Sequence, residues 1–173
     1  ARELQISDDQ RPEFRICDGV YGIDQLVDLY RSSHAFVTAT RGEGFGLCAV
    51  EAMACGIPVV STTFSAMGEY LSEATGFPIA HREVPVPGDT MFPWFREDQR
   101  WGEPDLRQMG AAMRAVHEDR QLAASKGCAA RDFVARAFAS GVIGEQMRDR
   151  ISVCASKTGG KMERVAAEEA TVQ

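Results

Sequence analysis

The sequence predicts an α/β fold in which helices cover both faces of a parallel sheet. Four short apolar runs, with little alternation of apolar and polar residues, are typical of strands buried on both faces: 14–18, 35–40, 57–62 and 76–80. Between and after these runs, apolar residues recur every three or four positions, which is the spacing of one helix face. Strands that alternate with helices favour a parallel sheet, so we expect an open α/β sheet.

The first half of the chain contains two predicted strand-helix pairs. FRICD (14–18) predicts a strand that stops at Gly19 and is followed by a helix. AFVTAT (35–40) is an apolar, β-branched run that ends at Arg41-Gly42, and Gly56 closes the helix after it. One face of each helix is marked in turn by Ile23, Leu26, Val27 and Tyr30, and by Leu47, Val50 and Ala54.

The second half begins with two more predicted strands, IPVVST (57–62) and GFPIA (76–80), separated by a short helix near 67–71. Residues 81–102 interrupt the alternation, and their prolines and aromatic residues, including Trp94 and Trp101, are typical of an ordered surface excursion. Pro104 suits the first residue of a helix, and further helices are predicted at 120–137 and 141–153. We expect one domain over 1–153 and a mobile or solvated helical tail over 154–173.

Composition argues against several classes of protein. The 173-residue chain has a formal net charge of -6, so it lacks the positive field that holds nucleic acid. No apolar run approaches the roughly 18 to 20 residues of a membrane span, and the first residues lack the apolar core of a signal peptide. Five cysteines without a CxxC pair favour free thiols in a reducing compartment, the cytoplasm. The chain begins with Ala rather than Met, and we expect it to be cut from a longer polypeptide.

The segment EGFGLCAVEAMACGIPVV (43–60) carries the chemical signal. It follows one predicted strand and leads into the next, and open α/β sheets bind ligands beyond the carboxyl ends of their strands. Gly44 and Gly46 permit a tight turn that brings backbone amides against a phosphate or a sugar hydroxyl. Glu43 and Glu51 are separated by about 10 Å if most of the intervening residues are helical. Two carboxylates at that separation suit a ligand with hydroxyls at both ends and a diphosphate between them.

This segment resembles the signature of the retaining glycosyltransferases of family four, also called group 1. In that family two glutamates with seven residues between them lie within EGFGLP..EAMACG.PVV. The resemblance implies that Glu43 contacts the sugar as the catalytic residue and that Glu51 binds the ribose hydroxyls. It implies that loop amides meet the sugar and diphosphate and that the base rests on the loop after the preceding strand. The implied donor-binding residues are Glu43, Gly44, Phe45, Gly46, Leu47, Glu51, Val20 and Tyr21.

The chain departs from the family pattern at several places. Cys48 stands where the family usually has proline. Ser65-Ala66 replaces the two glycines of a Gly-Gly-x-x-Glu turn, whose glutamate is retained as Glu69. An Arg and a nearby Lys, which in the family neutralise the diphosphate, are missing. The resemblance covers about residues 14–150, and it implies the C-terminal, Rossmann-like, doubly wound half of a GT-B fold without its first strands.

The implied function is transfer of a sugar from a nucleoside-diphosphate sugar to an acceptor, with retention of configuration, in carbohydrate biosynthesis. The three histidines show no metal-ligand spacing, and we expect no metal or other cofactor. The acceptor domain, or a partner chain that supplies it, is missing, so the isolated chain should be inactive. Arg41 either assists a phosphate or is a solvated arginine. A non-catalytic, transferase-derived scaffold or subunit remains the main alternative; a sugar-nucleotide epimerase is disfavoured by the family-four segment.

Overall fold

The computed structural model describes residues 13, 15–87, 95–96 and 98–170, with side chains described up to residue 157. Its elements, in chain order, are α1 (Ile23–Ser32), β1 (Phe36–Val37), α2 (Leu47–Ala54), β2 (Val59–Thr62), the 3-10 helix η2 (Ser65–Glu69), β3 (Gly76–Ile79), β4 (His81–Pro85), β5 (Arg100–Pro104), α3 (Leu106–Glu118), α4 (Arg120–Ala137) and α5 (Ser140–Ala170).

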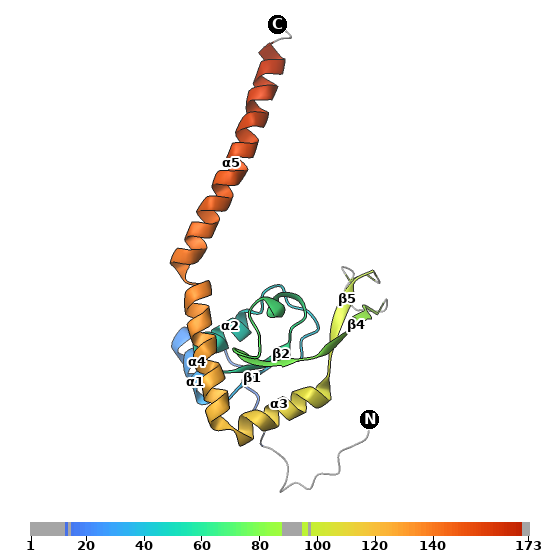
Figure 1. The fold of residues 1–173 in the computed structure, drawn as a ribbon, viewed down its shortest axis with the longest axis vertical. Coiled ribbons are helices and arrows are strands. Elements are labelled where there is room, and N and C mark those ends of the chain that lie inside the picture. Colours follow the sequence, from blue (N-terminus) through green and yellow to red (C-terminus); the bar gives the residue numbers. More distant parts are fainter. Residues whose placement is uncertain (1–12, 14, 88–94, 97, 171–173) are drawn as a thin grey trace.

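A parallel sheet with the order β1-β2-β3 forms the centre of the fold (Figure 1). All four residues of the middle strand β2 are buried. Helix α2 lies on one face of the sheet and α3 on the other, while α4 packs beside both helices. The predicted α/β fold, with a parallel sheet covered on both faces, is confirmed.

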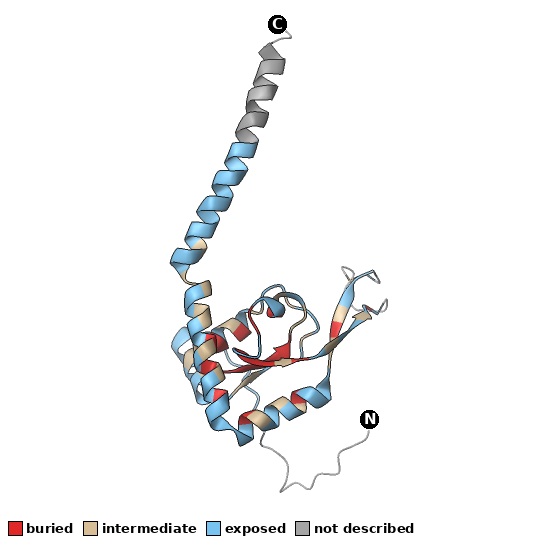
Figure 2. Ribbon diagram, viewed as in Figure 1, coloured by how far each residue is buried: buried red, intermediate tan, exposed pale blue. Residues whose placement is uncertain are grey.

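Alternate residues of β2 point into two separate cores, as the strand period of two requires. Val59 lies in a cluster with the inner face of α2, whereas Val60 lies in a cluster with Met109 and Val116 of α3. Figure 2 shows these buried residues on the strands and on the helix faces that meet them. The strands are therefore packed on both faces of the sheet, and this packing fixes the position of their carboxyl ends.

The prediction for the first strand is wrong. Residues 15–18 form no strand, and Ile16 is 91% exposed; Phe14 lies outside the described residues. A strand needs a neighbour to satisfy its backbone hydrogen bonds, and the backbone of this segment pairs with none of the described strands. The strand expected at 35–40 is confirmed only as the two residues of β1, which pairs with β2 alone among the described strands.

The first two helices confirm their predictions. Helix α1 begins at Ile23 and α2 begins at Leu47, although both of these side chains are exposed. After α2, Gly56 adopts a left-handed φ of +78°, the conformation that ends many helices and that glycine adopts without steric cost. The short helix expected near 67–71 is a 3-10 helix that begins two residues earlier, at Ser65.

The surface excursion predicted at 81–102 contains an antiparallel hairpin that the sequence analysis missed. Strands β4 and β5 pair from His81 with Pro104 to Pro85 with Arg100, while Trp94 lies outside the described residues. Pro104 ends β5 instead of starting a helix, because the side chain of Asp105 caps α3 by accepting from two backbone amides.

The last two helices differ in how they pack. Helix α4 spans the predicted range, and its alanines contribute to both cores. Helix α5 extends away from the sheet and is exposed along nearly all of its described side chains (Figures 1 and 2). It passes without a break through the expected domain boundary at 153, so the division at that residue stays a prediction. No helix in the described part of the chain is long and apolar enough to cross a bilayer.

Candidate functional site

The glycine loop, residues 42–46, runs from the carboxyl end of β1 to the start of α2. Two side chains from the η2 region hold its backbone. The Tyr70 hydroxyl donates to the Phe45 carbonyl at 2.6 Å, and the Ser65 hydroxyl donates to the Glu43 carbonyl at 2.8 Å. Because both bonds tether main-chain carbonyls, the loop has a defined position above the sheet.

Gly46 is the hinge between the loop and α2. Its φ of +82° is left-handed, and a Cβ at this position would collide with the Tyr70 hydroxyl and lie 2.8 Å from the Met67 sulfur. Position 46 therefore requires glycine for two reasons, backbone conformation and space. The requirement explains why the family-like segment has glycine where the helix begins.

The amino end of α2 is left open by this arrangement. No side chain caps the helix, and among the described residues the amides of Leu47 and Cys48 have no protein acceptor. A small cleft of about 70 Å³ lies against this end and is lined by Glu43, Gly46, Leu47 and Cys48, together with side chains of the core. Unpaired amides at a helix amino end attract anions, so the cleft joins a carboxylate to an anion-binding surface.

Glu51 lies one helical turn beyond Leu47 and Cys48, on the same face of α2. One of its carboxylate oxygens, Oε2, accepts a hydrogen bond of 3.0 Å from the hydroxyl of Tyr30 on α1. Burial is the main factor that raises the pKa of the Tyr30 hydroxyl, followed by this bond to Glu51. Tyr30 thus remains a donor to Glu51 at physiological pH.

Tyr70 lies on the opposite side of the loop, below Phe45. Burial, followed by the carboxylates of Glu43 and Glu69, raises the pKa of Tyr70 to about 12. The ring of Phe45 packs against Tyr70 with centroids 5.9 Å apart, and against Phe138 at the end of α4 with centroids 5.3 Å apart. The phenol therefore stays protonated and anchors the loop to the core.

Arg41, before the loop, is engaged by the β4-β5 hairpin. Its Nε lies 2.6 Å from Oε2 of Glu103, a second nitrogen contacts the other oxygen, and the guanidinium lies 5.5 Å from the ring centre of Trp101. The amide of Gly102 donates to the Arg41 carbonyl. Neither reading of Arg41 anticipated this role, in which the side chain braces the loop against the hairpin.

The expected base-binding residues lie elsewhere in the described structure. Val20 is fully exposed and Tyr21 is 42% exposed, both in the segment before α1. No hydrogen bond or ring contact between described residues joins either of them to the glycine loop. The site therefore brings together Glu43, Gly46 and Leu47 in one cleft, with Glu51 beside it, while the role of Val20 and Tyr21 stays a prediction.

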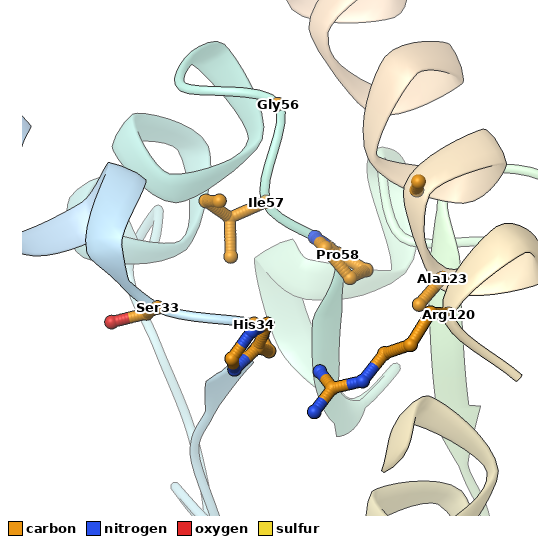
Figure 3. A pocket seen from close by; sticks show the side chains of 8 residues that line it. Ser33, His34, Gly56, Ile57, Pro58, Arg120 and Ala123 are labelled. Carbon is orange, nitrogen blue, oxygen red and sulfur yellow. The ribbon is translucent and has the colours of Figure 1, made fainter. Parts of the chain in front are cut away.

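A larger cavity lies at the other end of the strands. It has a volume of about 370 Å³ and is lined by Ser33, His34 and Arg120, among other residues (Figure 3). It adjoins the amino ends of β1 and β2 and contains neither glutamate of the pair. Since ligands in open α/β sheets bind beyond the carboxyl ends, the smaller cleft is the better candidate despite its size.

Sequence reasoning missed the residues that support the site from outside the signature. Tyr30 carried a visible signal, because it is a polar group on the otherwise apolar face of its helix. Tyr70 and Phe138 carried no signal in the sequence, since their roles depend on how η2 and α4 pack. Among the described residues, no three His, Cys, Asp or Glu side chains lie close enough together to hold a metal ion.

Comparison with known proteins identifies the family. The family model described as glycosyl transferases group 1 matches residues 2–86, which include the glycine loop, α2 and the strands β1 to β4. Over this stretch, nearly half of its length, the chain is similar to the group 1 glycosyl transferases. The resemblance found in the sequence is therefore confirmed at the level of the family.

Several curated proteins are similar to parts of the chain. A D-inositol 3-phosphate glycosyltransferase of Streptomyces bingchenggensis is 33% identical over 102 residues, which are 56% of this chain and 20% of the relative. A lipopolysaccharide core biosynthesis mannosyltransferase, LpsB, of Rhizobium meliloti is 50% identical over 58 residues, or 32% of this chain and 16% of the relative. A mannosylfructose-phosphate synthase of Agrobacterium fabrum is 32% identical over 97 residues, covering 54% and 20% of the two chains. The chain thus spans a fifth or less of each of these relatives.

Proposed function

We propose that this chain is the donor-binding part of a retaining glycosyltransferase that uses a nucleoside-diphosphate sugar. The observation that carries the proposal is the cleft, where the Glu43 side chain and the open amino end of α2 meet beyond the carboxyl end of β1. Glu43 orients the sugar, and the amides of Phe45, Gly46 and Leu47 receive the diphosphate. Glu51 accepts from the ribose hydroxyls, and Val20 and Tyr21 support the base.

The chemistry that these groups supply is electrostatic. Cleavage of the donor leaves negative charge on the diphosphate and oxocarbenium character on the sugar. Amides aimed at the diphosphate stabilise the first charge, and the Glu43 carboxylate steadies the sugar. The loop holds these groups in place before the reaction begins, because Tyr70 and Ser65 fix its carbonyls. We propose that no metal ion is needed.

The size of the cleft supports a second domain. About 70 Å³ is the space of two or three water molecules, far less than a nucleotide sugar occupies. We propose that most of the donor lies along the open surface of the loop and α2 and is covered by an acceptor domain. That domain belongs to the same polypeptide or to a partner chain, in a reducing compartment such as the cytoplasm.

The test measures binding and transfer separately in the full-length protein. Calorimetry with UDP and GDP should show binding that is weakened in Glu51→Ala. Incubation with labelled UDP- and GDP-sugars and an acceptor extract should give a glycosylated product whose anomeric configuration matches that of the donor by NMR. Absence of nucleotide binding by the wild-type protein would refute the proposal, and an inverted product would refute retention.

A non-catalytic scaffold is the second candidate, and one observation favours it. No Arg or Lys lines the described part of the cleft, and Arg41 is bound to Glu103. A scaffold that kept the nucleotide site would bind UDP or GDP without forming any product. The combination of measured binding and absent transfer in the full-length protein would therefore select this candidate.

A further inference from the structure

The hydrogen bond between Tyr30 and Glu51 connects the first helix of the chain to the candidate donor site. It joins residues 21 positions apart and spans 3.0 Å between the Tyr30 hydroxyl and Oε2 of Glu51. An exposed glutamate on a helix normally samples several rotamers, because water serves each of them equally well. Here a fixed donor on the neighbouring helix favours one of them.

Tyr30 can act as a fixed donor because its ring is anchored. The side chain is half-buried and packs against the core cluster beneath α2, and its ring lies 6.2 Å from that of Phe36 on β1. A tyrosine has only two side-chain torsions, so packing of the ring also sets the position of the hydroxyl. The donor is therefore placed by the core and not by the solvent-exposed bond itself.

The neighbourhood of the hydroxyl places Glu51 beside the cleft. Cys48 is close enough to Tyr30 to contribute to the raised pKa of its hydroxyl, and Cys48 also lines the cleft that contains Glu43. Cys48 and Glu51 are three residues apart and share one face of α2. The carboxylate held by Tyr30 consequently lies at the border of the candidate donor site.

The same bond leaves half of the carboxylate available. Each carboxylate oxygen has two acceptor positions, and among the described residues only Oε2 of Glu51 accepts from a side chain. Oε1 is therefore available to accept from a ligand hydroxyl. A vicinal diol is the group that gains most from an oriented carboxylate, because its two hydroxyls donate in a fixed geometry.

We propose that Tyr30 is a positioning residue for the nucleotide: by holding Oε2 of Glu51, it directs the remaining oxygen to the ribose diol. The inference rests on the proposed function, since it requires Glu51 to meet a ribose. It adds that Tyr30, a residue of α1 outside the family signature, strengthens the preference of the site for ribose over deoxyribose.

The test compares UDP and GDP with their 2'-deoxy and 3'-deoxy forms by calorimetry, using the full-length protein. The readout is the ratio of deoxy to ribose Kd for the base that the wild type binds. Tyr30→Phe keeps the ring and removes only the hydroxyl, and it should lower this ratio by about two- to tenfold, the range of one net hydrogen bond. Affinity for the deoxy nucleotide that lacks the Glu51 contact should hardly change.

Two further variants separate positioning from general damage. Ser32→Ala removes a hydroxyl from the same helix that bonds only to the Leu29 carbonyl, and it should leave the ratio unchanged. In Glu51→Ala the ratio should fall, and adding Tyr30→Phe should lower it no further, because Tyr30 acts through Glu51. Thermal unfolding of each variant shows whether it is folded.

The outcomes distinguish the inference from the function on which it rests. A wild type with no preference for ribose would overturn the assignment of Glu51 to the ribose and this inference with it. If the preference is present and lost in Glu51→Ala but kept in Tyr30→Phe, the positioning role alone is overturned. Equal weakening of ribose and deoxyribose binding in Tyr30→Phe would also overturn it, because that pattern indicates a structural role.

Discussion

Alanine substitutions at three glycines should separate backbone strain from steric conflict at the hinge of the candidate site. Gly44 is exposed, and a Cβ there would meet nothing within 4 Å. Gly56 has a left-handed φ of +78° but is equally open, whereas Gly46 combines a φ of +82° with contacts to Tyr70 and Met67. Gly44 therefore has neither backbone strain nor steric conflict for an added methyl group, Gly56 has backbone strain alone, and Gly46 has both.

The magnitudes follow from those two obstacles. Gly44→Ala should change the free energy of unfolding by less than about 0.5 kcal/mol, as at most open surface positions. Gly56→Ala should cost about 1 to 2 kcal/mol, the penalty of a left-handed conformation for an L-residue. Gly46→Ala should cost about 1 to 3 kcal/mol more than Gly56→Ala, because the methyl group forces Tyr70 or Met67 to move in a packed region.

Urea denaturation followed by circular dichroism measures all three variants against the wild type. The decisive quantity is the difference between Gly46→Ala and Gly56→Ala, since strain is common to both. If the two variants are equally stable, the close packing of Tyr70 and Met67 against position 46 is wrong. If Gly44→Ala is as damaging as Gly46→Ala, the loop is held in another conformation.

Four further predictions concern the site and the whole chain. Glu51→Ala should weaken nucleotide binding by about 1.5 to 3 kcal/mol in calorimetry, the scale of a hydrogen bond to a charged group, and unchanged affinity would contradict its role. Glu43→Ala should chiefly reduce turnover, since its partner is the transferred sugar; normal transfer rates would remove Glu43 from the mechanism. Because the folded state raises the pKa of Tyr70 from 10.0 to about 12, unfolding free energy should fall as pH rises through that window. Tyr70→Phe should make this fall shallower in denaturation series at several pH values, and an equally steep fall would count against the raised pKa. Residues 1–173 expressed alone should not catalyse transfer, and turnover comparable to that of the full-length protein would refute this.

Local signals predicted much of the fold because the forces behind them act over one helical turn or one strand. The apolar spacing of Ile23, Leu26 and Tyr30 located α1, although none of its residues is fully buried, and the predicted range 120–137 matches α4. The glycine loop was found for a similar reason. Its turn, its left-handed Gly46 and the start of α2 are all encoded within a few residues.

The errors lie where a segment depends on a distant partner. FRICD has the composition of a strand, but residues 15–18 pair with none of the described strands and form no strand. The β4-β5 hairpin was missed because its pairing joins His81 to Pro104, and its register depends on segments far apart in the sequence. The start of α3 is a local error instead, because Asp105 caps the helix through the amides of Arg107 and Gln108 and the helix therefore begins after Pro104.

The sequence by itself predicted the α/β class and the positions of most helices, and it singled out Glu43, the glycines and Glu51 as candidate site residues. Only the tertiary structure decided how those groups are held: Tyr70 beneath the loop and Tyr30 against Glu51. The physical reason is that these contacts join residues more than twenty positions apart in the sequence. Their geometry is set by how α1, α2 and η2 pack on one sheet, and no local pattern of residues encodes that packing.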